Sequence, residues 1–179
     1  MTDVVDSQTR SRMRSGIRGK NTKPELALRR SLHALGLRYR LHAKGITGKP
    51  DIVMSKYRAV IFVHGCFWHR HPGCRYATVP ATRPEFWVAK FDANVMRDAA
   101  VQSALREAGW RVGKVWECAL RTETSTAQTR DMVAAWLHGA DAVLEVGEAE
   151  VRNVPCPDPG AREKIWHMRK MHGLNCPLQ

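Results

Sequence analysis

The chain has 179 residues, a length that suits one domain, and its 29 Lys and Arg outnumber its 17 Asp and Glu, for a formal net charge of +12. It contains no apolar stretch of the roughly 18 residues that a membrane helix needs, and its N-terminus lacks the apolar centre of a secretory signal. We therefore expect a cytoplasmic protein, associated with the nucleoid if bacterial. The positive charge favours nucleic acid as partner over a merely soluble basic surface.

The predicted elements begin after an Arg-rich stretch, residues 1–20, which is either a solvated arm or an arm that follows a DNA backbone. A capping box with a proline, TKPE at 22–25, predicts a helix that ends near Gly36. A short strand is expected at 37–41. Glu25 either caps the helix or points into an active site.

The middle of the chain alternates strands and helices. Strands are predicted at 51–54 and 59–63, joined by a tight turn, and again at 110–116. A long helix is predicted from Pro84 to about Ala108, with a buried face formed by Val95, Ala99 or Ala100, Leu105 and Ala108. Because this helix connects two strands, those strands should pair in parallel.

The C-terminal part carries weaker signals. A helix is predicted at 126–137, and residues 142–146 have the composition of a strand. We divide the chain into a basic DNA-binding arm at 1–20, a catalytic domain at 21–140 and an extension at 141–179 without an assigned role.

Two neighbouring strand ends offer ligands for Mg²⁺, which prefers oxygen atoms from carboxylates, carbonyl groups, water and phosphate. Asp51 opens one strand and supplies a carboxylate, while Val63 ends the next and supplies its backbone carbonyl. His64 and His69 follow directly, and a neutral imidazole can accept a proton from attacking water near neutral pH. Zinc ligation or simple exposure is the alternative for either histidine.

The five cysteines form an odd set, which argues against a disulfide framework in a cytosolic protein. Cys66, His71 and Cys74 have the spacing of a zinc knuckle, and Cys118 should end the neighbouring strand at the same edge. This Cys₃His set predicts a structural zinc site. Free thiols, or His69 in place of His71, remain open. Cys156 and Cys176 lie in the Pro-rich tail.

Aromatic residues cluster in the loops around these ligands, namely Phe67, Trp68 and Trp87. Tryptophan is most often a core residue. In a basic protein, apolar rings in loops can also enter the base stack, and opening a base step costs less at a mismatch.

At this point the sequence resembles a known family, the very short patch repair DNA mismatch endonucleases. The resemblance covers Thr9 to Leu137. It rests on RSRM at 10–13, NTKPE at 21–25, GKPDIV at 48–53, VIFVHGCFWHRH at 60–71, TRPEFW at 82–87, NVMRD at 94–98, GWRV at 109–112 and VWECAL at 115–120. It implies a restriction-endonuclease-like α/β core, with a central mixed sheet flanked by helices and a structural zinc site.

The resemblance also implies an activity: a nick in one strand of double-stranded DNA, 5′ to the thymine of a T:G mismatch that arises when 5-methylcytosine deaminates. We expect the protein to act as a monomer, with other repair proteins as further partners. Alternatives are a zinc-stabilised module that only binds DNA, and a related restriction- or homing-type nuclease that cuts matched DNA.

By position, the resemblance assigns site roles as follows. The Mg²⁺ ligands are the carboxylate of Asp51 and the carbonyl of Val63, the general base is His69, and the supporting residues are His64 and Glu25. The zinc ligands are Cys66, His71, Cys74 and Cys118. The residues that intercalate into the DNA are Phe67, Trp68 and Trp87, and those that contact bases are Lys90 and Asn94. In the arm, either Met13 or Arg14 enters the minor groove. The link from His71 to Cys74 is one residue longer than the family's form.

Overall fold

The computed structural model describes residues 8–9, 19–41 and 43–152. Met13 and Arg14 lie outside this part of the chain, as do Cys156 and Cys176. The elements, in chain order, are α2 (Lys23–Ala34), β1 (Ile52–Met54), β2 (Ala59–His64), α3 (Pro84–Glu107), β3 (Arg111–Trp116), α4 (Glu123–His138), β4 (Val143–Val146) and α5 (Glu148–Arg152). Within the described ranges, no helix is both long enough and apolar enough to span a membrane.

In the described part of the chain, four strands form one mixed sheet in the order β1-β2-β3-β4. β1 and β2 are antiparallel, whereas β2 pairs with β3, and β3 with β4, in parallel. α3 makes the connection between β2 and β3, as the sequence predicted. β4 continues the sheet beside β3, and the division of the chain at residues 20 and 140 stays a prediction.

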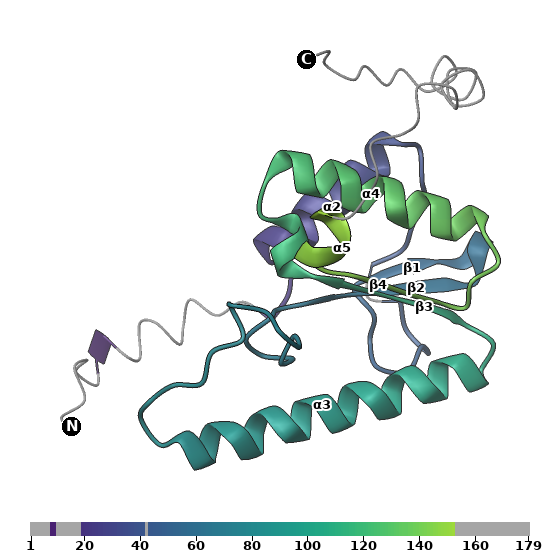
Figure 1. Cartoon of the computed structure of the whole chain (residues 1–179). Coiled ribbons are helices and arrows are strands. Elements are labelled where there is room, and N and C mark those ends of the chain that lie inside the picture. Colours follow the sequence, from purple (N-terminus) through teal and green to yellow (C-terminus); the bar gives the residue numbers. More distant parts are fainter. Residues whose placement is uncertain (1–7, 10–18, 42, 153–179) are drawn as a thin grey trace.

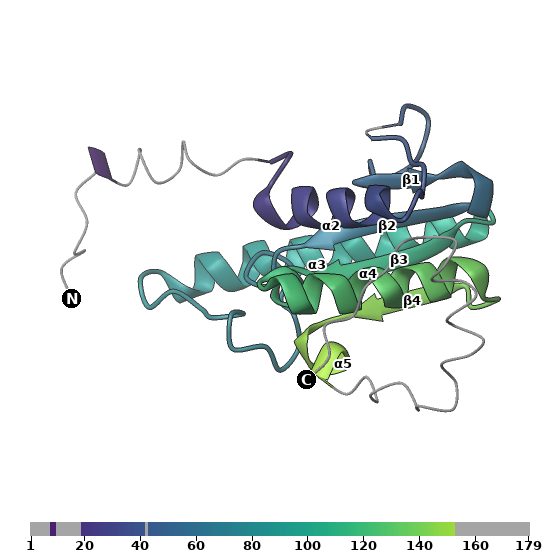
Figure 2. The ribbon, with the colours of Figure 1, turned by 90° about the horizontal axis from the view of Figure 1, so that it is seen from above.

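Helices cover both faces of the sheet (Figures 1 and 2). α2 and α4 pack on one face, where Leu28, Ile61 and Val133 are fully buried. α3 covers the other face, where Val60 and Leu105 are buried. Successive residues of β2 point to opposite faces, so this strand contributes to both cores. The fold is therefore the expected mixed α/β sheet flanked by helices.

The local connections follow their sequence signals. β1 and β2 are joined by a short 3₁₀ helix, Ser55–Tyr57, whose last turn places Arg58 in the left-handed region. α4 begins at Glu123, three residues before the predicted start, because Thr122 and Ser125 form a reciprocal capping box.

Two predictions about local structure were wrong. The predicted strand at 37–41 contains only one bridge residue, Arg40, which pairs with Val53. The predicted buried face of α3 is also displaced: Val95, Ala99, Ala100 and Ala108 are exposed, and of the residues named only Leu105 is buried.

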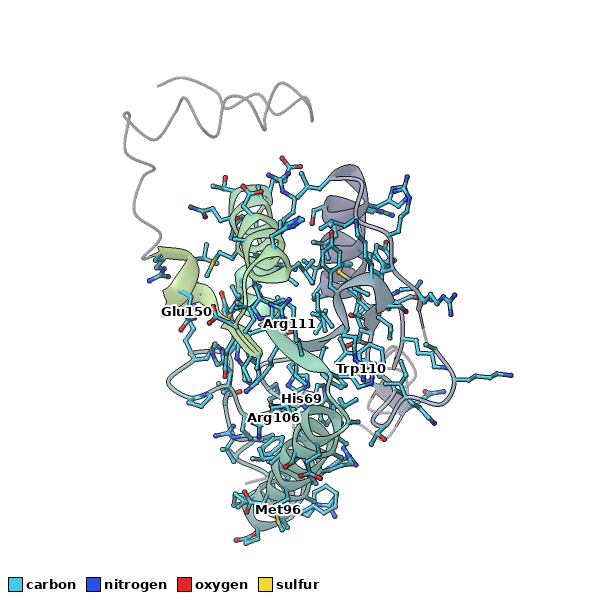
Figure 3. All side chains as sticks on the ribbon, turned by 90° about the vertical axis from the view of Figure 1, so that its right-hand side faces the viewer. His69, Met96, Arg106, Trp110, Arg111 and Glu150 are labelled. Carbon is cyan, nitrogen blue, oxygen red and sulfur yellow. The ribbon has the colours of Figure 1, made fainter. Side chains whose placement is uncertain are left out.

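The physical reason for the displaced face lies in the polar residues of α3. The side of the helix that faces the sheet carries Phe91, Asn94, Asp98, Val101 and Leu105 at helical spacing. Asn94 and Asp98 are polar, so a search for apolar periodicity moves the face by one position. Met96 points away from the sheet and is 73% exposed (Figure 3).

Candidate active site and metal centre

Asp51 and Val63 lie together at one edge of the sheet. Ile52 pairs with Ile61 in the antiparallel hairpin, so the residue before β1 lies next to the end of β2. The backbone N–H of Val63 donates a hydrogen bond to Oδ2 of Asp51 at 2.8 Å. This bond holds the Asp51 carboxylate next to the end of β2. The Val63 carbonyl at this end of β2 is the expected second ligand of the Mg²⁺ ion.

A pocket of about 260 Å³ opens beside this pair. It is lined by Gly48, Lys49, Asp51, Phe62, His64, His69, Arg97, Asp98, Val101 and Gln102. Asp51 and His69, which are 18 positions apart in the sequence, therefore face the same small space. His69 lies between the sheet and α3 (Figure 3).

His69 has a carboxylate partner that the sequence reasoning missed. Its Nδ1 lies 2.5 Å from Oδ2 of Asp98 on α3. Burial disfavours the charged Asp98 carboxylate, but the hydrogen bond and the charge of His69 outweigh burial, and the pKa of Asp98 is lowered. Asp98 is thus an anion that can hold the imidazole. The sequence did offer a signal for Asp98: it is the last residue of the motif NVMRD and lies one helical turn after Asn94, on the same side of the helix.

His64 lies beneath His69. The two rings stack with their centroids 3.9 Å apart and their planes within 13° of each other. Burial, together with the neighbouring His69, lowers the pKa of His64 to about 3, so His64 is neutral at physiological pH. A neutral, buried ring supports His69 from one side without adding a positive charge to the pocket.

Glu25 does not line this pocket but connects to it through Arg29. Glu25 accepts hydrogen bonds from the N–H of Asn21 at 3.0 Å and from the hydroxyl of Thr22 at 2.9 Å, and its own N–H donates to Thr22 Oγ1, the N-cap of α2, at 3.5 Å. It also pairs with Arg29 at 2.8 Å, with both side chains buried. The Arg29 guanidinium in turn donates to the backbone carbonyl of Asp51 at 3.4 Å. Both readings of Glu25 are therefore compatible with its position.

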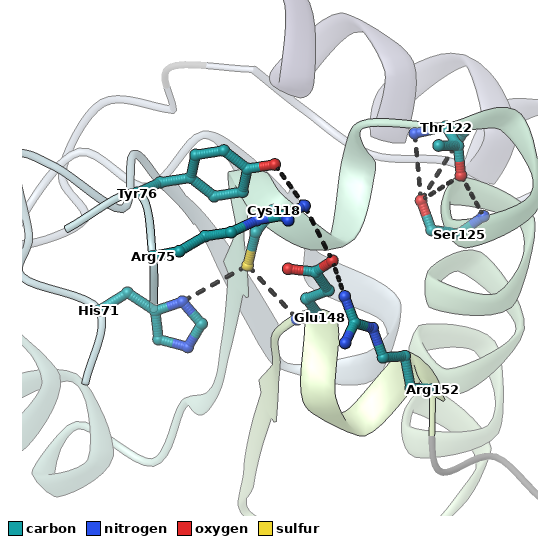
Figure 4. Close-up of polar contacts among 8 residues, drawn as sticks. All are labelled: His71, Arg75, Tyr76, Cys118, Thr122, Ser125, Glu148 and Arg152. Carbon is teal, nitrogen blue, oxygen red and sulfur yellow. Dashed lines mark hydrogen bonds and ion pairs between the residues drawn. The ribbon is translucent and has the colours of Figure 1, made fainter. Parts of the chain in front are cut away.

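The four expected zinc ligands converge at one point. One ligand atom from each of Cys66, His71, Cys74 and Cys118 lies within 4.8 Å of the others. The Nδ1 atom of His71 is 3.5 Å from Sγ of Cys66. It is 3.4 Å from Sγ of Cys118 (Figure 4). A tetrahedral Zn²⁺ with Zn–S of about 2.3 Å and Zn–N of about 2.0–2.1 Å has an S···N edge of about 3.5 Å. The donor set thus fits a metal ion, with His71 rather than His69 in the set.

The surroundings of this centre favour a thiolate at Cys118. Cys118 accepts a hydrogen bond from the Cys66 thiol and another from the backbone N–H of Glu148, at 3.3 Å, and these contacts lower the pKa of Cys118 to about 6. The shared proton and burial raise the pKa of Cys66. Deprotonated sulfur is the form that binds metal.

A second group, formed by His64, His69 and Asp98, also has ligand atoms within 4.8 Å of one another. The hydrogen bond between His69 and Asp98 and the stacking of the two histidines already account for this proximity. Both carboxylates of the pocket, Asp51 and Asp98, remain suitable oxygen donors for a hard cation.

The aromatic residues form a half-buried cluster next to the pocket. The ring of Phe67 lies 5.0 Å from that of Trp68 and 5.7 Å from that of Trp87. Phe91, which the sequence reasoning did not single out, is fully buried beneath them, 5.0 Å from Phe67. Phe91 is a base for the cluster, while Phe67, Trp68 and Trp87 are neither fully buried nor fully exposed.

Lys90 and Asn94 frame this aromatic cluster from α3. The Lys90 ammonium lies 5.5 Å from the ring of Trp68 and 5.8 Å from that of Trp87. The Asn94 amide donates to the backbone carbonyl of Trp68 at 3.0 Å. These contacts place both residues beside the cluster, and their contacts with DNA bases stay a prediction.

Fold and site together indicate a class of protein: a nuclease with a carboxylate–histidine pocket at the edge of a mixed sheet and a separate Cys₃His group that could hold a metal ion. Comparisons with known proteins agree. The family model "DNA mismatch endonuclease Vsr" matches residues 2–75. The Escherichia coli DNA mismatch endonuclease Vsr is 44% identical over 149 residues, which cover 82% of this chain and 94% of the relative.

Two further relatives are nicking enzymes. The type II nicking enzyme V.XorIIP of Xanthomonas oryzae is 48% identical over 120 residues, 67% of this chain and 88% of the relative. The type II nicking enzyme V.NmeAIP of Neisseria meningitidis is 42% identical over 123 residues, 69% of this chain and 87% of the relative. The chain belongs to the Vsr family of DNA mismatch endonucleases, and is therefore a DNA-cleaving hydrolase.

Proposed function

We propose that this protein nicks one strand of duplex DNA at T:G mismatches. It hydrolyses the phosphodiester on the 5′ side of the thymine, as a monomer, and so starts the repair of deaminated 5-methylcytosine. The main support is that Asp51, His69 and Asp98 line a single pocket. The half-buried residues Phe67 and Trp68 come immediately before His69 in the chain. Family membership supports DNA as the substrate.

His69 acts as the general base. Because its Nδ1 is bonded to the Asp98 carboxylate, the proton of the neutral imidazole resides on Nδ1, and Nε2 is the basic nitrogen. Nε2 accepts a proton from the attacking water, and Asp98 stabilises the imidazolium that results. His64 keeps the ring in place by stacking.

The catalytic metal site would be made of the Asp51 carboxylate and the Val63 carbonyl, and the ion would be Mg²⁺. When bound, Mg²⁺ supplies stabilisation of the charge that develops on the phosphate and on the departing alkoxide. Asp51 has a fixed orientation for this task because the Val63 N–H holds its carboxylate. Arg29 links the Asp51 backbone to Glu25, which gives Glu25 a supporting role.

Selectivity for mismatches would come from the aromatic cluster. Phe67, Trp68 and Trp87 enter the duplex at the mispaired step, where unstacking costs less than in matched DNA. The Cys₃His centre, occupied by Zn²⁺, holds the loop that carries Phe67 and Trp68. Lys90 and Asn94 then contact the bases next to the opened step, and Met13 or Arg14 reaches the minor groove.

The test uses two labelled duplexes that differ only in one pair, T:G or T:A. Each is incubated with the protein and Mg²⁺, and again with EDTA. The proposal expects a single nick 5′ to the thymine, in the T:G duplex only and with Mg²⁺ only. Cleavage of both strands of the T:A duplex would instead support a restriction- or homing-type nuclease.

The role of Asp51 has its own test. Asp51→Ala should still bind the T:G duplex, because the aromatic cluster and the basic surface remain, but its nicking rate should fall below detection. Binding is measured by electrophoretic mobility shift and nicking on the same samples. Cutting at the wild-type rate would remove Asp51 from the metal site.

A further inference from the structure

Trp116 lies between the two sites described above. It is the last residue of β3 and pairs in register with His64, the last residue of β2. Its side chain is 2% exposed and packs against Cys66 and Cys118. It belongs to the motif VWECAL, and none of the functions assigned so far uses it.

The Trp116 ring contacts two histidines of the sites described above. One face stacks on His71, with centroids 4.2 Å apart and planes 11° apart. The ring also meets His64 in an edge-to-face contact, with centroids 5.5 Å apart and planes at 73°. His64 in turn stacks on His69 at 3.9 Å. The rings of His71, Trp116, His64 and His69 therefore form a continuous row from the metal centre to the active site.

The orientation of Trp116 is set from β4. Its Nε1–H donates a hydrogen bond to Oε1 of Glu145 at 2.7 Å. The second oxygen of Glu145 binds the ammonium of Lys114 at 2.9 Å, and that ammonium lies 5.2 Å from the Trp116 ring. A buried indole N–H needs such a partner, and this bond prevents the ring from rotating between the two histidines.

We infer that Trp116 is a positioning residue for DNA cleavage: it holds His64 beneath His69 and ties that geometry to the metal centre through His71. The inference rests on the proposed function, because it assumes that His69 acts on the substrate. Trp116 does not itself line the pocket, so its effect passes through His64, which does. A displacement of about 1 Å at a reacting group can lower a rate by on the order of a hundredfold.

The competing view is that Trp116 only fills the core. Trp136 provides a matched control for that view. It is also buried, at 5% exposed, and its Nε1–H is also satisfied, by the carbonyl of Asp141 at 2.9 Å. It is a residue of α4, packs in the core between this helix and the sheet, and lies in neither site. A purely structural role predicts similar consequences at both positions.

The experiment compares Trp116→Leu, Trp116→Phe and Trp136→Leu as zinc-loaded, full-length proteins. Zinc per chain, the thermal unfolding midpoint, and kcat and KM on the T:G duplex with Mg²⁺ are measured for each. At equal zinc content, we expect Trp116→Leu to lower kcat by on the order of tenfold or more, with KM within about twofold. Trp136→Leu should lower the thermal unfolding midpoint about as much as Trp116→Leu does, because both changes remove a buried indole, but should keep kcat within about twofold of wild type.

A second readout does not depend on catalysis. The ring-proton NMR resonances of His69, which contacts His64 but not Trp116, should shift in zinc-loaded Trp116→Leu without DNA and in the milder Trp116→Phe, but not in Trp136→Leu. Trp116→Phe keeps an aromatic ring, so it decides the question if the leucine variant does not fold.

Equal kcat in the Trp116 and Trp136 variants, with unshifted histidine resonances, would overturn the inference. The two proposals can fail separately. If wild-type protein leaves the T:G duplex intact, the proposed function fails, whereas the resonances still show whether Trp116 positions His64 and His69.

Discussion

Gly147 has no Cβ atom, and the ring of His71 occupies the space that a Cβ atom there would need. A Cβ atom at this position would lie 2.6 Å from Cε1 and 2.9 Å from Nε2 of His71, which is closer than Cβ contacts in proteins allow. The N–H of Gly147 is also bound to Glu150 at 2.8 Å. The segment that follows β4 thus packs directly on His71, one of the four expected zinc ligands.

Gly147→Ala should therefore weaken the metal centre. The added methyl group pushes the His71 ring away from the three cysteines, so the zinc content per chain and the thermal unfolding midpoint should both fall. Gly19→Ala is the control, because nothing lies within 4 Å of a Cβ at Gly19. Full zinc occupancy in Gly147→Ala, measured by atomic absorption, would contradict the proposed packing.

Cys118→Ser tests the ligand set itself. Cys118 is 3% exposed and lies 3.4 Å from the His71 nitrogen, so serine would leave a weak ligand in a buried site. We expect less than one zinc per chain and a lower unfolding midpoint. Cys156→Ser, outside the ligand set, should retain full zinc. Unchanged zinc in Cys118→Ser would exclude this residue as a ligand.

Asp98→Asn tests the orientation of His69. An asparagine amide can donate to Nδ1, which places the imidazole proton on Nε2 and removes the base from the pocket. We expect kcat on the T:G duplex to fall by on the order of a hundredfold or more, while the Kd for DNA changes little. The measurement is single-turnover nicking together with a binding titration.

Asp92→Asn on the same helix makes the identical chemical change at an exposed position. It should nick at a rate close to that of wild type. If Asp98→Asn were equally active, the short contact between Asp98 and His69 would have no catalytic role.

Gly48→Ala should distort the pocket where the loop before β1 meets α3. Gly48 lines the pocket at φ +76°, and a Cβ there would lie 2.1 Å from Cγ1 of Val101 on α3. Relief of this clash has to turn the Val101 side chain or move α3, which carries Asp98. Such overpacking typically costs about 1–3 kcal/mol of unfolding free energy. We expect a lower kcat as well.

Gly45→Ala separates the clash from backbone strain. Gly45 has φ +79° and nothing within 4 Å of a Cβ, so it carries the same left-handed penalty without a collision. Denaturant unfolding of the two variants measures the difference. Equal unfolding free energies in Gly48→Ala and Gly45→Ala would show that α3 does not pack against Gly48 as described.

Some of the architecture could be read from local patterns. The α2 cap, the β1–β2 hairpin and the crossover through α3 each depend on residues close together in the chain. The convergence of the four expected zinc ligands was also predictable, because three of them lie within nine positions and the fourth, Cys118, follows the neighbouring parallel strand by two residues. Strand ends that meet at one edge of a sheet bring such residues together.

Other features could not be read from the sequence. The contact between His69 and Asp98 depends on how α3 is rotated on the sheet, and apolar periodicity predicted that rotation incorrectly. Arg40 pairs with Val53 through a single bridge, too short for a strand pattern to predict well.

The sequence by itself determined the residue types of this protein's chemistry, the order of its elements and its family, because these follow from composition, spacing and motif. Only the tertiary structure decided the partner of His69, the packing of Gly147 against His71 and the row of rings through Trp116. These contacts join positions 29 to 76 residues apart. Their formation depends on packing between elements, which no local pattern of side chains specifies.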